Sequence, residues 1–205
     1  MRKIFNKIKK NLYINKSLFV FLIVFVIIGL LSGSIYALIL NEGDKKMVFD
    51  YLNTFFENIK TKNINYDITS FNTIIFTLGL AIVIWLLGIS VIGFFIIFFL
   101  LFLKSFILGF SVSSIILSFN LKGILIALAY VFPHLIINIL IFVLLSGYGL
   151  IISFKIIRSF FKNQSLNFKS IFSRYCFVLI FSIFFLSITS LYEIYITPKL
   201  LSLLV

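Results

Sequence analysis

Apolar and polar residues alternate along the chain in long blocks, and five apolar stretches are long enough to cross a lipid bilayer as helices. A helix needs roughly 20 apolar residues to span a hydrocarbon core of about 30 Å. Spans are predicted at 17–40, at roughly 71–90 and 95–118, at 119–154 and at 175–197. The pattern therefore predicts an all-α integral membrane protein with about five transmembrane helices.

The apolar block at 73–118 must contain a turn, because a single helix of that length would be about 69 Å long, twice the thickness of the bilayer. We place the turn between Gly88 and Gly93, so that the second and third spans form a hairpin; a turn near Lys104 is the alternative. The fourth span contains Pro133, which lacks an amide hydrogen and whose ring clashes with the carbonyl group four residues earlier. We therefore expect that span to be broken.

A polar segment at 41–72 separates the first two spans and contains five acidic and four basic residues. Within it, apolar residues recur at helical spacing, which predicts an amphipathic helix near 46–60. Such a helix either lies on the headgroups or over its own bundle, or it docks a partner outside the cytoplasm. The candidate docking residues are Tyr51, Leu52, Phe55 and Phe56.

The basic residues predict the orientation of the chain. Six of them lie in the head at 1–16 and five in the segment at 155–174, and neither segment contains an acidic residue. Because basic segments stay in the cytoplasm, we expect a cytoplasmic N-terminus, an uncleaved first span, a basic cytoplasmic loop at 155–174 and a short extracytoplasmic tail at 198–205. The net charge of +12 thus indicates topology and contact with membrane lipids, and no nucleic acid partner is expected.

The sequence offers little for catalysis. It has one histidine, His134, and it lacks a Gly-rich phosphate loop, a Cys-x-x-Cys pair and a nucleophile elbow. We expect no catalytic residue, no metal site and no cofactor. The residues that cost most to place in lipid are Lys104, His134, Asn138 and Glu193, and ionisable residues within spans indicate a functional site by default. Polar contact between helices is the alternative.

Two glycines on the first span, Gly29 and Gly33, are one helical turn apart. Small residues at this spacing let the backbone of another helix approach closely. The sequence leaves open whether that helix belongs to the same chain or to a second copy in a homo-oligomer.

Two short motifs carry a resemblance to a known family. The sequence KSFILGF runs from Lys104 to Phe110, and PHLIIN runs from Pro133 to Asn138. Together with the basic head, one span, an amphipathic outer segment and four further spans, this layout resembles the stage II sporulation protein M family over nearly the whole chain. The matching motif residues are Lys104, Phe106, Gly109, Phe110, Pro133 and His134. Ser105 and Leu135 replace glycines of the family pattern, and Asn138 replaces its acidic residue.

The resemblance implies a role in sporulation. Members of that family lie in the mother-cell membrane at the sporulation septum, where they join two peptidoglycan-degrading proteins, stage II sporulation proteins D and P, during engulfment of the forespore. On this interpretation the chain is a membrane scaffold that anchors the hydrolases and degrades nothing itself. The alternative from the residues alone is a permease or transporter subunit, with a midplane site where Pro133 breaks a helix and where Lys104, His134 and Asn138 converge.

Overall fold

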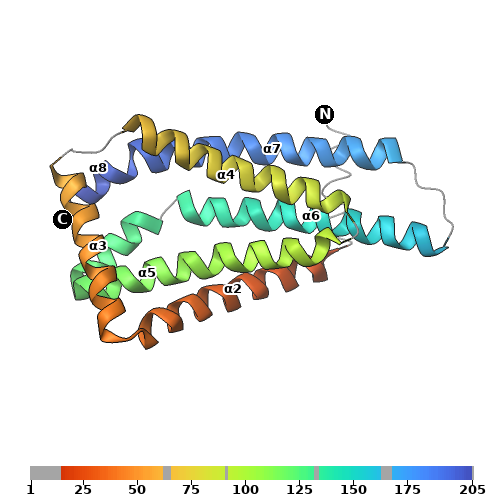
Figure 1. The fold of residues 1–205 in the computed structure, drawn as a ribbon. Coiled ribbons are helices and arrows are strands. Elements are labelled where there is room, and N and C mark those ends of the chain that lie inside the picture. Colours follow the sequence, from red (N-terminus) through yellow and green to blue (C-terminus); the bar gives the residue numbers. More distant parts are fainter. Residues whose placement is uncertain (1–14, 62–65, 91, 132–133, 163–167, 205) are drawn as a thin grey trace.

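The computed structural model describes residues 15–61, 66–90, 92–131, 134–162 and 168–204, and all regular elements in these segments are helices (Figure 1). The elements are α2 (Lys16–Ile39), α3 (Glu42–Lys60), α4 (Tyr66–Ile89), α5 (Gly93–Val131), α6 (His134–Lys162), α7 (Phe168–Tyr195) and α8 (Thr197–Ser202). Five of them, α2, α4, α5, α6 and α7, are long and apolar enough to cross a membrane. The prediction of an all-α chain with five helices that could span a membrane is confirmed for these residues.

The long helices lie roughly side by side, with the connections gathered at two ends (Figure 1). α2 begins at the end of the bundle where α6 ends and α7 begins, whereas α3, α8 and the C-terminus lie at the opposite end. The two segments predicted to be cytoplasmic thus adjoin one end, and the polar segment that includes α3 lies at the other. The assignment of either end to the cytoplasm rests on the charge pattern.

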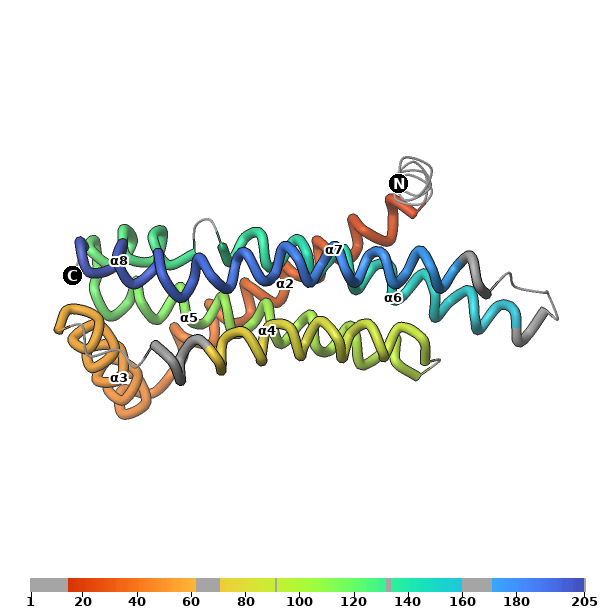
Figure 2. The backbone as a smooth tube through the Cα atoms, turned by 90° about the horizontal axis from the view of Figure 1, so that it is seen from above, coloured from red at the N-terminus to blue at the C-terminus, as the bar shows by residue number. Residues whose placement is uncertain are grey.

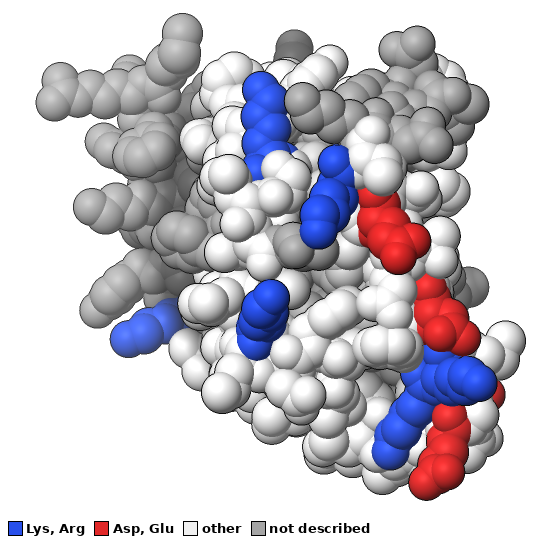
Figure 3. All heavy atoms as spheres, turned by 90° about the vertical axis from the view of Figure 1, so that its left-hand side faces the viewer, with Lys and Arg blue, Asp and Glu red and all other residues white. Residues whose placement is uncertain are grey.

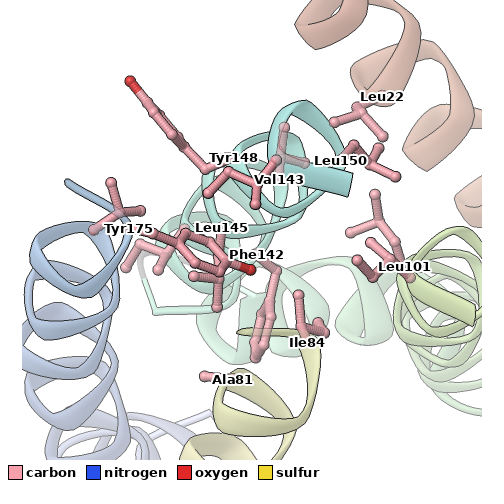
Figure 4. Close-up of a cluster of buried hydrophobic side chains, with 14 of the residues drawn as sticks. Leu22, Ala81, Ile84, Leu101, Phe142, Val143, Leu145, Tyr148, Leu150 and Tyr175 are labelled. Atoms are coloured by element: carbon pink, nitrogen blue, oxygen red, sulfur yellow. The ribbon is translucent and has the colours of Figure 1, made fainter. Parts of the chain in front are cut away.

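α6 is the central helix of the bundle. In its most apolar stretch 67% of the residues are buried, against 22% in the corresponding stretch of each other span. Figure 4 shows side chains of α2, α4, α5 and α7, among them Leu22, Ile84, Leu101 and Tyr175, gathered around this helix. Lipid tails are as apolar as these side chains, so close packing and polar contacts between helices hold such a bundle together.

The predicted close approach at Gly29 and Gly33 occurs within the chain, between α2 and α5. A Cβ atom on Gly29 would lie 2.7 Å from the Cβ of Ser105, and one on Gly33 would overlap the backbone of Phe106. From the other side, a Cβ atom on Gly109 would overlap the carbonyl group of Leu30. Small residues one turn apart on both helices therefore interlock. Ser105, where the family pattern has glycine, is a small residue in this contact.

The connection between α4 and α5 lies at residues 90–92, within the region from Gly88 to Gly93 where the turn was expected. Two contacts explain why the chain packs tightly beside this turn. The Ser153 hydroxyl donates to the carbonyl oxygens of Gly88 and Ser90, at 2.9 and 3.1 Å. A Cβ atom on Gly88 would overlap the hydroxyl of Tyr175, so α4, α6 and α7 meet here without room for a larger residue.

The structure differs from the prediction of one broken span at 119–154. The chain reverses at Asn120, which has a φ of 50° and interrupts α5. The short stretch after it folds back, and a Cβ atom on Gly123 would lie 2.6 Å from the carbonyl oxygen of Ile115. α6 then crosses the bundle by itself from His134. Pro133 lies outside the described residues, between α5 and α6.

The positive φ of Asn120 leads to a prediction about substitutions at this position. A positive φ is uncommon for residues other than glycine, and asparagine tolerates it better than branched residues do. Asn120→Gly is expected to keep or raise the melting temperature, whereas Asn120→Val should cost about 1–3 kcal/mol of unfolding free energy. Thermal unfolding of the purified chain in detergent checks this. Equal stability of both variants would contradict the reversal at this position.

Other boundaries also differ from the predicted ones. α3 begins at Glu42, four residues before the predicted start, because the side chain of Asn41 caps it by accepting a hydrogen bond from the Asp44 amide at 2.8 Å. α4 begins at Tyr66, inside the segment expected to be polar. The region 155–174 is not a simple loop: α6 continues to Lys162 and α7 begins at Phe168. The helices continue through these charged ends. A hydropathy profile detects only the apolar part of each helix and therefore misses the ends.

Candidate functional site

α3 lies across one end of the bundle, at a steep angle to the long helices (Figures 1 and 2). Phe56 and Ile59 anchor it in a second apolar cluster with residues of α5 and α8. In this cluster Phe56 meets the ring of Phe119 edge-on, with centroids 5.2 Å apart. Leu201 of α8 is buried in the same cluster. The amphipathic helix is therefore held on its own bundle by one of its faces.

A second apolar face of α3 remains exposed. Met47, Tyr51 and Phe55 follow one another at intervals of four residues and are 72%, 72% and 40% exposed. Of the four predicted docking residues, Tyr51 and Phe55 thus present surface, whereas Leu52 is half-buried and Phe56 is 2% exposed. Phe56 packs mainly against the bundle, so it offers much less accessible surface than Tyr51 and Phe55.

An apolar groove of about 420 Å³ lies between this exposed face and α5. It is lined by Met47, Val48, Tyr51, Leu52, Phe55, Phe56, Phe110, Ser111, Ser114, Ile115 and Tyr130. The hydroxyl oxygen of Ser114 is buried and has no hydrogen-bond partner among the described residues. An apolar wall with an unsatisfied hydroxyl suits a ligand or protein segment that is mostly apolar and brings a polar atom.

Acidic side chains follow the outer side of α3, as the row of red residues in Figure 3 shows. The acidic residues of α3 are Glu42, Asp44, Asp50 and Glu57. Its basic residues are Lys45, Lys46 and Lys60. Asp50 and Glu57 are two helical turns apart and both exposed, on a side of the helix away from Tyr51 and Phe55. α3 thus combines a packed face, an exposed apolar face and an acidic face.

Beneath α3, the predicted intramembrane polar residues of α6 lie in a packed cluster. His134 and Asn138 are 0% and 1% exposed. The Thr189 hydroxyl of α7 donates to the side-chain oxygen of Asn138 at 2.5 Å. The ring of His134 stacks on that of Tyr192, with centroids 5.9 Å apart. Such packing favours polar contact between helices, because a transport path requires these side chains to face water.

Lys104 extends from α5 into the same half of the bundle. Its amine lies 5.1 Å above the ring of Phe142, a distance typical of a cation–π interaction. Lys104 and Glu193 of α7 are also close enough for their opposite charges to interact. The ammonium group of Lys104, which is costly to place in lipid, thus faces the bundle. The Phe142 ring and the charge of Glu193 both favour it there. Glu193 supplies a carboxylate in this region, where α6 has the uncharged Asn138.

Tyr130 connects the cluster with the groove. It lines the groove beside Ser114, and its ring meets that of His134 edge-on, with centroids 6.1 Å apart. Phe110 of the KSFILGF motif lines the same groove and contacts the ring of Tyr36, with centroids 6.0 Å apart. Residues of both motifs therefore lie close to the groove. Gly109 packs α5 against α2, Phe110 lines the groove, and His134 contacts Tyr130, which also lines it.

Several of these residues carried no sequence signal. Thr189, Tyr192 and Thr197 are ordinary polar and aromatic residues of the last span and its end, yet all three lie against the α6 motif. Tyr130 was equally unmarked, whereas Ser114 belongs to a Ser-x-x-Ser pattern from Ser111 to Ser114 that indicates polar contact between helices. One pattern could have indicated part of this cluster: Thr189 and Glu193 are four residues apart, which places a hydroxyl and a carboxylate on one side of a helix.

Comparisons with known proteins identify the family. The family model described as Stage II sporulation protein M matches residues 18–198, which include three spans, most of the other two, α3 and both motifs. A search of curated proteins and a search of solved structures each return no match. The matching family is not a known family of enzymes. The chain belongs to the stage II sporulation protein M family.

Proposed function

We propose that this protein is a membrane scaffold of sporulation, which anchors cell-wall hydrolases at the septal membrane during engulfment. The observation that carries the proposal is the apolar groove between α3 and α5, at the end of the bundle predicted to face away from the cytoplasm. The partners expected from the family are stage II sporulation proteins D and P. In this proposal the chain itself catalyses no reaction.

The shape of α3 supports a docking role. Exposed aromatic side chains are enriched where proteins bind one another, since they bury much area and lose little conformational entropy. Tyr51 and Phe55 provide two such rings beside a concave surface. An apolar segment of a hydrolase close to its membrane anchor would fill the groove, and a polar atom on it would satisfy the Ser114 hydroxyl.

Packing contacts in the rest of the bundle hold the walls of the groove in place. Phe56 and Ile59 fix α3, Gly109 fixes α5 against α2, and the α6 cluster fixes α7 and α8. A rigid surface loses little entropy when a partner binds, which favours affinity.

The test is co-purification with the two hydrolases from sporulating cells. Tyr51→Ala with Phe55→Ala is expected to lower recovery of the partners at least about 30-fold, because truncated aromatic anchors commonly cost about 2 kcal/mol or more. The matched control is Tyr195→Ala with Phe184→Ala, which removes the same two ring types from exposed positions on α7.

Both double variants must insert into the membrane in normal amounts, since neither pair is buried. Loss of both hydrolases in the α3 variant alone supports docking at the groove. Equal recovery from the two variants would remove the groove from the proposal. Phe56→Asp is a poor probe, because it disrupts the packing of α3 itself.

A further inference from the structure

We propose that the cleft between α2 and α6, at the end of the bundle opposite α3, binds one anionic phospholipid of the membrane. This inference is independent of the docking groove and concerns a different part of the molecule. It commits to a lipid that carries a phosphate, one net negative charge and acyl chains.

The cleft has a volume of about 530 Å³ and combines cationic and apolar walls. It is lined by Asn15, Leu18, Ile151, Phe154, Lys155, Ile157 and Arg158. Lys155 and Arg158 are three residues apart on α6, so both cations lie on one side of the helix. Lys155 is half-buried and Arg158 is exposed, which places positive charge both inside the cleft and at its mouth.

The chain supplies no acidic residue to this end of the bundle. The sequence has none before Glu42 and none between Asp67 and Glu193. Arg174, near the start of α7, adds a further positive charge to this end of the bundle. A negative group from outside the chain would therefore be attracted here. The planar, forked guanidinium of Arg158 is suited to a phosphate, and the Lys155 amine to a second oxygen.

The apolar walls favour a lipid over free phosphate. Leu18 of α2 and Phe154 of α6 line the cleft, and Phe154 is 45% exposed. These side chains belong to membrane spans, so an acyl chain can extend along them while the headgroup reaches the cations. A phosphatidylcholine headgroup fits poorly, because it adds a positive charge beside Lys155 and Arg158.

The experiment is native mass spectrometry of the full chain in neutral detergent, titrated with phosphatidylglycerol or with phosphatidylcholine of the same acyl chains. Each basic residue near anionic lipid contributes about 1 kcal/mol, so two should give about a 30-fold preference for phosphatidylglycerol at about 1.4 kcal/mol per factor of ten. Lys155→Gln with Arg158→Gln should lose this preference. Lys122→Gln with Lys199→Gln, which removes two exposed lysines from the opposite end, should keep it.

Single variants separate a defined cleft from general attraction to a basic surface. Arg158→Gln should weaken phosphatidylglycerol binding several-fold, whereas Lys16→Gln, an exposed cation at the same end outside the cleft lining, should not. Equal effects of the two would overturn the site. Inorganic phosphate at millimolar concentration should leave the lipid adduct in place. Displacement by phosphate alone would show an anion site that does not require a lipid and would overturn the proposal as stated.

Discussion

Gly109→Leu is expected to separate α2 from α5 and to lower the free energy of unfolding by about 3 kcal/mol or more. Even a Cβ atom on Gly109 overlaps the carbonyl group of Leu30, and backbone atoms cannot move aside without parting the helices. The loss would be a large share of the total stability, which is typically about 5–15 kcal/mol. Unfolding in detergent can be followed by the fluorescence of Trp85, the one tryptophan of the chain.

Gly79→Leu is the matched control for this variant. Gly79 lies on α4, and beyond its chain neighbours and the backbone of its own helix no atom lies within 4 Å of the place its Cβ would occupy. The control should therefore unfold like the unmodified chain. If Gly109→Leu and Gly79→Leu were equally stable, the interlock of α2 with α5 would be wrong. Loss of a dimer without loss of the fold would instead place Gly109 at an interface between copies.

The second large effect is expected at Lys104. Lys104→Met removes the cation that interacts with Glu193 and covers the ring of Phe142. Loss of the cation–π contact with Phe142 and of the attraction to Glu193 should together cost about 1–2 kcal/mol. The same unfolding assay measures this. Lys122→Met, at an exposed lysine of the same helix, should have little effect.

A double-mutant cycle isolates the interaction between the two charges. Glu193→Gln in the Lys104→Met background should cost less than it does alone, with a coupling energy of about 1 kcal/mol. Fully additive costs would show that the two side chains do not interact. The cycle also tests whether Glu193 serves as the counter-charge of Lys104.

The sequence was sufficient for the class of fold and for the number of helices long enough to span a bilayer. Hydropathy and length determine how many helices fit the bilayer, and both the five spans and the turn before Gly93 were read from them. The family resemblance was also correct. The charged ends of α6 and α7 were missed, because a helix that leaves the membrane keeps its hydrogen bonds while its side chains become polar.

Tertiary relations were mostly beyond the sequence. Nothing in its composition marks α6 as the central helix, because all five spans are comparably apolar. A hydropathy scale does not distinguish a side chain that faces lipid from one that faces the protein interior. The reversal at Asn120 depends on the backbone of one residue within an apolar block. Of the candidate site, the motif residues and the exposed rings of α3 were anticipated. Their neighbours Tyr130 and Thr189 became visible only when distant segments were brought together.

The topology of the bundle is the central claim, since both the docking groove and the lipid cleft depend on it. It is tested most directly by thiol labelling in a Cys176→Ser background, with a single cysteine introduced by Asp50→Cys on α3 or by Arg158→Cys on α6. A membrane-impermeant maleimide applied to intact protoplasts should label the first variant, and label the second only after permeabilisation. Labelling of both positions from the same side of the membrane would contradict the account.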